Sequence, residues 1–174
     1  PKALRSAVTV QTLSDSLASA LNDPEIVKTI AWAKEQIPQV EEKLDWLAAQ
    51  ELLYYLRTLY EDTGHPIQYA EYNKQLDWVN RRVSLLAQYA PKRLWELRAA
   101  RAERLGDKPL GEYKKLADAD WRERFKSVDP NMLKQALKVA ANEHIEAKGW
   151  KPLLTGGLQE LKILATTASL DETF

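Results

Sequence analysis

The sequence predicts an all-α fold, a compact bundle of six to eight helices with antiparallel neighbours and no sheet. Alanine and leucine are abundant, whereas the 174 residues include only 6 glycines. The β-branched residues are scattered and do not alternate with polar ones, which favours helix over strand. Proline and glycine also stand where helix ends are expected, and they divide the chain into segments of helical length.

Capping signals and glycines define the expected helices. Asp23 places a capping acid before Pro24, and Asp129 does the same before Pro130. Gly64 suits the left-handed residue that follows a helix end. The expected helices cover residues 9–21, 24–37, 38–63, 66–90, 91–105, 109–126, 130–148 and 157–168.

The third of these helices, residues 38–63, is apolar around much of its circumference, and we expect it to form the centre of the core. Pro38 indicates a break or a kink before it. Glu51 projects among its apolar residues. A carboxylate in that position must be paired, or its pKa must rise.

The helix over 66–90 has two apolar faces. One is a stripe with a heptad-like spacing, formed by Tyr72, Leu76, Val79, Val83, Leu86 and Ala90. Trp78, Leu85 and Tyr89 lie nearly opposite, with Arg81 and Arg82 beside them. Either the helix is packed on both sides, or the second face is an exposed contact surface of the kind that Trp, Tyr and Arg dominate.

The helix over 91–105 carries arginines among leucines. Arg98 and Arg101 fall on the face of Leu94, Leu97 and Leu105. One of the two arginines reaches a buried acid such as Glu51, or this face is open and binds phosphate or an acidic partner. In the helix over 130–148, a stripe that ends at His144 predicts that this histidine faces the core. We expect a turn at residues 155–157, Thr-Gly-Gly.

The chain is expected to form a single helical domain over residues 1–174, with a possible internal linker at 106–111 and a short C-terminal appendage at 150–174. The N-terminus lacks the apolar core of a signal peptide, and no apolar run approaches the roughly 20 residues of a membrane span. We therefore expect no membrane association. The absence of cysteine is typical of a reducing compartment, and we expect a cytoplasmic protein.

Catalytic and cofactor motifs are missing. The two histidines, His65 and His144, do not make a zinc site in a chain without cysteine, and phosphate-binding glycine motifs and nucleophile elbows are absent. We expect neither a metal nor another cofactor, and no chemistry of the chain's own. A deep pocket that joins Glu51 or His144 to another titratable group would revive the enzyme hypothesis.

The net charge of zero conceals an uneven distribution of charge. Residues 81–151 carry 17 Lys and Arg against 10 Asp and Glu, whereas residues 1–80 carry 7 against 12. Aromatic residues are interleaved with the basic ones, as in non-specific nucleic-acid surfaces. The candidate binding residues are Arg81, Arg82, Lys92, Arg93, Arg98, Arg101, Arg104, Arg122, Arg124, Lys126, Trp78 and Tyr89.

Two functions fit this pattern. The first is an accessory domain or small subunit of a DNA- or RNA-handling assembly that contacts phosphates through the basic region at 81–126. The alternative is a protein-interaction or self-assembly module that docks its basic face on an acidic surface of a partner or of another copy. Both are binding modules, and each is compatible with membership of a larger complex.

Overall fold

The computed structural model describes residues 2–114, 120–143 and 149–171, and within these ranges every regular element is a helix. Seven helices have eleven residues or more, which confirms the all-α prediction. The elements are α1 (Lys2–Thr12), α2 (Leu17–Ala20), α3 (Pro24–Glu42), α4 (Trp46–Tyr60), α5 (Pro66–Tyr89), α6 (Pro91–Leu105), α7 (Trp121–Phe125), α8 (Pro130–Glu143), α9 (Trp150–Ala165) and the 3₁₀ helix η2 (Ala168–Leu170).

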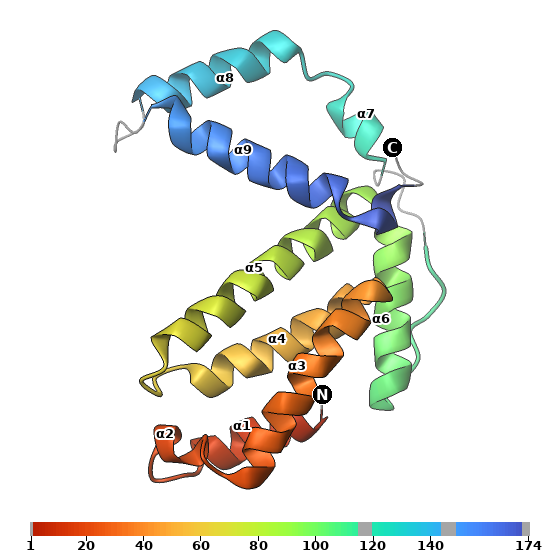
Figure 1. Ribbon diagram of the computed structural model, residues 1–174. Helices are drawn as coiled ribbons and strands as arrows, with labels where there is room; N and C mark the ends of the chain where they lie inside the picture. The colour runs from red at the N-terminus through yellow and green to blue at the C-terminus, as the bar shows by residue number, and fades with distance from the viewer. Residues whose placement is uncertain (1, 115–119, 144–148, 172–174) are drawn as a thin grey trace.

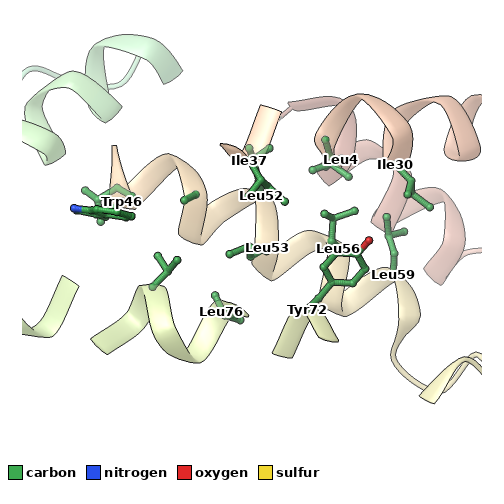
Figure 2. Packing of buried hydrophobic residues seen from close by; sticks show 14 of the residues in the cluster. Leu4, Ile30, Ile37, Trp46, Leu52, Leu53, Leu56, Leu59, Tyr72 and Leu76 are labelled. Atoms are coloured by element: carbon green, nitrogen blue, oxygen red, sulfur yellow. The ribbon is translucent and has the colours of Figure 1, made fainter. Parts of the chain in front are cut away.

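Helix α4 is the centre of the core, as its apolar circumference predicts. Leu53, Leu56 and Leu59 are completely buried, and Trp46 and Leu52 are nearly so. Helices α1, α3, α5 and α6 all contact α4. Figure 2 shows side chains of these neighbours, among them Leu4, Ile37 and Leu76, converging on it. An apolar helix in water is stable only when it is covered in this way.

The first helices differ from those expected. Helix α1 begins at Lys2 and ends at Thr12, well before the predicted end at residue 21. Its buried residues Leu4, Ala7 and Gln11 follow helical spacing. Gln11 Nε2 donates hydrogen bonds to the carbonyl oxygens of Leu17 and Leu59, at 3.0 Å and 2.8 Å, and so fastens the end of α1 to α2 and α4.

Pro38 does not end a helix, because α3 continues through it to Glu42. The proline removes one backbone hydrogen bond, but the buried stripe that includes Ala33 and Ile37 holds the helix against the core. The break comes later, where Leu44 has a φ of 55°. Asp45 then caps α4 by accepting a hydrogen bond from Ala48 N at 3.0 Å.

Helix α5 packs on α4 through the predicted stripe, of which Tyr72, Leu76, Val79 and Leu86 are buried. On the opposite side Trp78, Leu85 and Tyr89 are half-buried. Lys162 of α9 lies over the ring of Trp78, and Tyr89 meets the ring of Trp121 of α7. The helix is therefore packed on both sides near its C-terminal end, rather than presenting the second face as an open surface.

Helices α8 and α9 extend away from the part of the molecule built by α1 to α4 (Figure 1). We call residues 130–143 and 150–165 the arm. Helix α9 contacts α5, whereas Ala141 is the one buried residue that the structure describes in α8. The predicted stripe of α8 does not face the core, because Leu133 and Leu137 are exposed; His144 lies outside the described residues.

Two other expectations about the C-terminal half are wrong. Residues 109–114 form no helix, since Pro109 and Gly111 disfavour it. Of the predicted helix over 109–126, the described residues contain α7, while residues 115–119 lie outside the described ranges. The expected turn at 155–157 is helical, because α9 already begins at Trp150. The division into a domain, a linker at 106–111 and an appendage at 150–174 stays a prediction.

The glycines of α9 give a test of its extent. Replacing Gly157 by Ala should raise the free energy of unfolding by about 0.5–1 kcal/mol, because alanine costs less backbone entropy in a helix and its Cβ would meet no atom within 4 Å. Gly106→Ala should lower it, because Gly106 has a φ of 75°. Urea unfolding followed by circular dichroism measures both; a loss of stability in Gly157→Ala would contradict the helix.

Candidate functional site

The predicted basic residues do not form a single surface. On α5, Arg82 lies against the chain end that follows α9. Its Nη1 donates to the carbonyl oxygen of Thr166 at 2.6 Å and to Thr167 Oγ1 at 3.1 Å. Its guanidinium stacks over the ring of Trp46 at 4.6 Å, and Trp46 Nε1 donates to Ser169 Oγ at 3.3 Å. Burial lowers the pKa of Arg82, with Glu41 opposing the shift.

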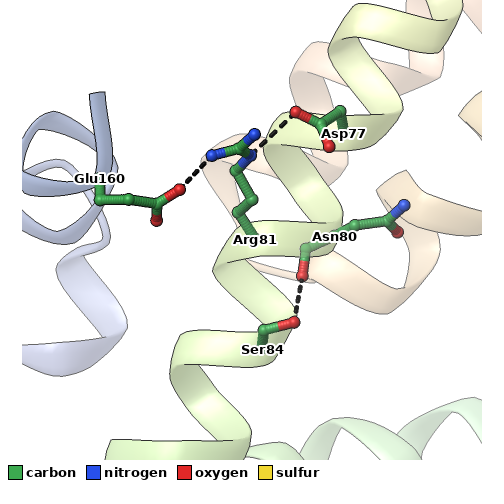
Figure 3. Close-up of polar contacts among 5 residues, drawn as sticks. All are labelled: Asp77, Asn80, Arg81, Ser84 and Glu160. Carbon is green, nitrogen blue, oxygen red and sulfur yellow. Dashed lines mark hydrogen bonds and ion pairs between the residues drawn. The ribbon is translucent and has the colours of Figure 1, made fainter. Parts of the chain in front are cut away.

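Arg81 connects α5 to the arm. Its guanidinium donates to Asp77 at 2.8 Å, one turn earlier in α5, and also to Glu160 of α9, as Figure 3 shows. These two hydrogen bonds raise the pKa of Arg81. Beside it, Lys162 Nζ lies 5.5 Å from the ring centre of Trp78. The second face of α5 therefore holds α9 in place.

The arginines of α6 face the acidic N-terminal half of the chain. Arg101 Nε lies 3.6 Å from Glu51 Oε2, and Arg104 Nη1 lies 2.8 Å from Asp45 Oδ2. The Glu51 side chain is only 10 % exposed. A buried carboxylate needs a partner. The ion pair with Arg101 is one of the two outcomes expected for the arginines of this helix, although the buried Glu51 Oε2 accepts no hydrogen bond from a described residue. Arg93 pairs with Glu96 on its own helix at 3.2 Å.

The basic residues in and directly after α7 also differ in the contacts that they make. Lys126 pairs with Glu123 at 3.4 Å, and the guanidinium of Arg122 lies over the ring of Trp121 at 4.6 Å. Trp121 in turn meets the ring of Tyr89 edge-on at 5.5 Å. Among the twelve candidate residues, those that are exposed and make no ion pair or side-chain hydrogen bond with a described residue are Lys92, Arg98 and Arg124.

Glu51 also lines a hollow of about 310 Å³ between α1, α4 and α6. The other residues of its wall are Lys2, Arg5, Tyr55, Arg101, Leu105 and Asp107. Acid–base catalysis needs a second group that can exchange a proton. Arg101, the ion-pair partner of Glu51, stays protonated in proteins and is no such group. Lys2, Tyr55 and Asp107 also line the hollow, so it does join Glu51 to other titratable groups, but among the described residues no hydrogen bond or ion pair links any of them to Glu51.

The arm carries an apolar surface that the sequence analysis did not single out. Eight of its large apolar side chains are each between 38 % and 67 % exposed. We call this set the arm face: Met132, Leu133, Leu137, Val139, Trp150, Leu154, Leu158 and Leu161. Exposed apolar residues are normal when scattered, whereas apolar residues that gather on one side of a helix can mark an interaction site.

The arm face follows helical periodicity in both helices. At 100° per residue, its members in α8 span a sector of about 160°, and those in α9 a sector of about 80°. Ile163, the buried residue of α9, lies on another side of the helix. At the same 100° per residue, Lys151 borders the face in α9, whereas in α8 Lys134 lies about 60° outside its edge and Lys138 lies opposite its centre; all three are exposed.

The sequence pattern behind this face was visible in α8, but it fits two different kinds of packing. The stripe through Leu133 and Leu137 is equally typical of a helix that packs on the core of its own chain and of one that packs on a partner. Helical periodicity tells which residues share a side, whereas the cover of that side depends on where the helix lies in the fold. The structure places α8 away from the core.

No family model, curated protein or solved structure matches this chain. The helices that the structure describes include none with the length and hydropathy of a membrane span. Within residues 2–114, 120–143 and 149–171, no group of three or more acidic or histidine side chains could hold a metal ion.

The contacts of Arg82 predict a structural role. Arg82→Ala should lower the free energy of unfolding by about 2 kcal/mol, because hydrogen bonds made by a charged group contribute more than neutral ones. Arg82→Lys should recover less than half of the loss, since an ammonium group cannot reproduce the fork and the stacking on Trp46. Urea unfolding measures these changes. Arg98→Ala is the matched control in the same basic region, and an equal loss there would contradict the role of Arg82.

Proposed function

We propose that this protein is a non-enzymatic helical binding module, an accessory domain or small subunit of a larger assembly, that docks a protein partner through the arm face. The observation that carries the proposal is the exposure of eight large apolar side chains on α8 and α9, the two helices that extend away from the part of the molecule built by α1 to α4. The largest apolar patch of an ordinary monomer is about 300–600 Å² and is often functional.

The composition of the arm face supports a protein partner. Trp and Met are enriched at protein interfaces, where flat and flexible apolar side chains fill the partner's pockets. Trp150 and Met132 supply both kinds. Arg81 and Glu160 join α5 to α9, and Lys162 lies over Trp78, so these contacts fix α9 while its members of the arm face remain exposed.

The charge distribution supports the same proposal. Arg101 and Arg104, which a phosphate-binding surface would use, are paired with acids of α4 and its cap. Arg82 is occupied by the residues after α9. A phosphate would have to compete with these contacts for the three arginines.

Site-specific photo-crosslinking in the cells that produce the protein tests this function. A photoreactive amino acid at Leu154 or Leu158 should give discrete adducts that protease removes and nuclease leaves intact. The matched controls are Leu13 and Ile67, which are 82 % and 78 % exposed and lie outside the arm. Adducts of equal yield at the controls, or none at the arm positions, would refute the proposal.

A second candidate function is nucleic-acid binding through the cations that remain unpaired. Lys92, Arg98 and Arg124 are exposed and make no ion pair with a described residue. Three such contacts would give a salt dependence with a slope near −3 in log K against log salt, since each neutralised phosphate contributes about −0.9.

Fluorescence anisotropy with labelled single- and double-stranded oligonucleotides at low salt checks this candidate. Replacement of Lys92, Arg98 and Arg124 together by Glu should abolish the binding. Glu substitutions at Lys2 and Lys28, which lie outside the basic region, should leave it unchanged. Absence of binding by the unmodified protein at low salt would eliminate the candidate.

A further inference from the structure

Two hollows meet beside the ion pair of Arg101 and Glu51. The first hollow is the one of about 310 Å³ between α1, α4 and α6, and the second hollow, of about 490 Å³, lies between α4, α5 and α6. Both are lined by Glu51, Tyr55 and Arg101, so they adjoin at these residues. The residues that line only the second hollow are Leu47, Gln50, Tyr54, Arg57, Leu76 and Asn80. Small-molecule sites have volumes of roughly 300–1,000 Å³, a range that includes both hollows.

Arg101 has unused hydrogen-bond donors where the two hollows meet. Its Nε lies 3.6 Å from Glu51 Oε2, which is an ion-pair distance but too long for a hydrogen bond. The Arg101 side chain is 45 % exposed, and its guanidinium donates no hydrogen bond to a described residue. The fork of an arginine matches the two oxygens of a carboxylate. A carboxylate can therefore bind Arg101 without displacing Glu51, whose charge holds the guanidinium in place.

The charges of the first hollow favour an anion with a single charge. Lys2 and Arg5 lie one turn apart on α1, and both are exposed without an ion pair to a described acid. With Arg101 they place three cations around the hollow, against the two carboxylates of Glu51 and Asp107. A carboxylate balances the excess of one positive charge. A phosphate dianion would bring a further negative charge close to two acids, which costs binding free energy.

The second hollow suits a flat ring. Tyr54 is 50 % exposed, and the ring centres of Tyr54 and Tyr55 lie 5.5 Å apart with an angle of 70° between their planes. Two rings in this arrangement form a corner, in which a third ring can stack on one and meet the other edge-on. The buried leucines Leu47 and Leu76 add apolar surface to the same wall.

Polar groups of the second hollow are only partly used by the chain. Gln50 Nε2 donates to Asn80 Oδ1 at 2.7 Å, which leaves Gln50 Oε1 and Asn80 Nδ2 without a described partner. The buried atoms Arg57 Nε and Glu51 Oε2 also lack a hydrogen bond with any described residue. Buried polar atoms in this condition are rare in proteins. A ring with a polar substituent would find both an acceptor and a donor in the amide pair.

We propose that the two hollows form one site for a small aromatic carboxylate. The carboxylate accepts hydrogen bonds from Arg101 and lies near Lys2 and Arg5, and the ring extends into the second hollow against Tyr54. Glu51 is a positioning residue, since it orients Arg101. Neither hollow includes a residue of the arm, so this small-molecule binding is independent of the docking function.

The test uses the full chain and naphthoate, which joins one carboxylate to two fused rings. Naphthamide has the same shape without the charge, and acetate has the charge without the rings. Titrations followed by heteronuclear NMR should show that naphthoate binds at least about tenfold more tightly than either, because only naphthoate engages both the arginine and the tyrosines. The signals that shift should include the side-chain Nε–H of Arg101 and the backbone amides of Tyr54 and Tyr55.

Matched variants assign the binding to the two hollows. Arg101→Gln should weaken naphthoate at least about tenfold, and Tyr54→Ala about fivefold, whereas Tyr54→Phe keeps the ring and should change little. Arg98→Gln, on the same helix but outside both hollows, should have no effect. Because Arg101→Gln deprives the buried Glu51 of its partner and can unfold the chain, the exposed Arg5→Gln provides a second test and should weaken binding about threefold.

Several results would overturn the proposal. One is equal binding of naphthoate and naphthamide, or no binding of naphthoate at all. Another is inorganic phosphate that binds as tightly as naphthoate, because the hollows would then be a general anion site. Shifts at Leu154 and Leu158 without a shift at Arg101 would place the probe on the arm face instead. Binding that Arg5→Gln and Tyr54→Ala both weaken, while Tyr54→Phe retains it, would support the proposal.

Discussion

The need to bury α4 organises the molecule. Leu53, Leu56 and Leu59 are completely buried, and no single neighbour could cover them, because the apolar residues of α4 extend around the helix. Helices α1, α3, α5 and α6 pack on it from different sides. The acids that flank and interrupt its apolar surface, Asp45 and Glu51, are then brought within reach of α6. The hydrophobic requirement of one helix thus sets the partners of the charged residues around it.

Charge neutralisation follows from that packing. The sequence separates an acidic N-terminal part from a basic middle part, and the fold places α6 of the basic part against α4 of the acidic one. Basic residues of the middle part and acidic residues of the N-terminal part therefore neutralise one another in pairs where α6 meets α4. Arg82 forms no ion pair among the described residues. Its guanidinium donates hydrogen bonds to the carbonyl oxygen of Thr166 and the hydroxyl of Thr167, which follow α9, and it stacks on Trp46. These arginines bind the chain to itself, which is why the arm face rather than the basic region is the stronger candidate for a binding site.

The apolar residues of the arm differ in exposure from those of α4 and α5. In α4 and α5 the apolar stripes are buried, whereas Leu133, Leu137, Leu154 and Leu158 have comparable spacing and remain exposed. Helix propensity and an amphipathic pattern explain why α8 and α9 are helical. A partner that covers the arm face would supply the burial that stabilises such helices elsewhere in the fold.

Local interactions made the helical class predictable. Helix starts at Pro24, Pro66, Pro91 and Pro130 and the left-handed end at Gly106 were readable, because capping and backbone preference depend on a few neighbouring residues. Gly64 also has a positive φ, but α4 ends earlier, at Tyr60. The central position of α4 was readable from its apolar circumference. Tertiary packing decided that α3 passes through Pro38, that α9 includes Gly156 and Gly157, and that Arg101 rather than Arg98 reaches Glu51. It also decided that the α8 stripe is uncovered, since periodicity defines the side of a helix but contacts between distant segments determine what lies against it.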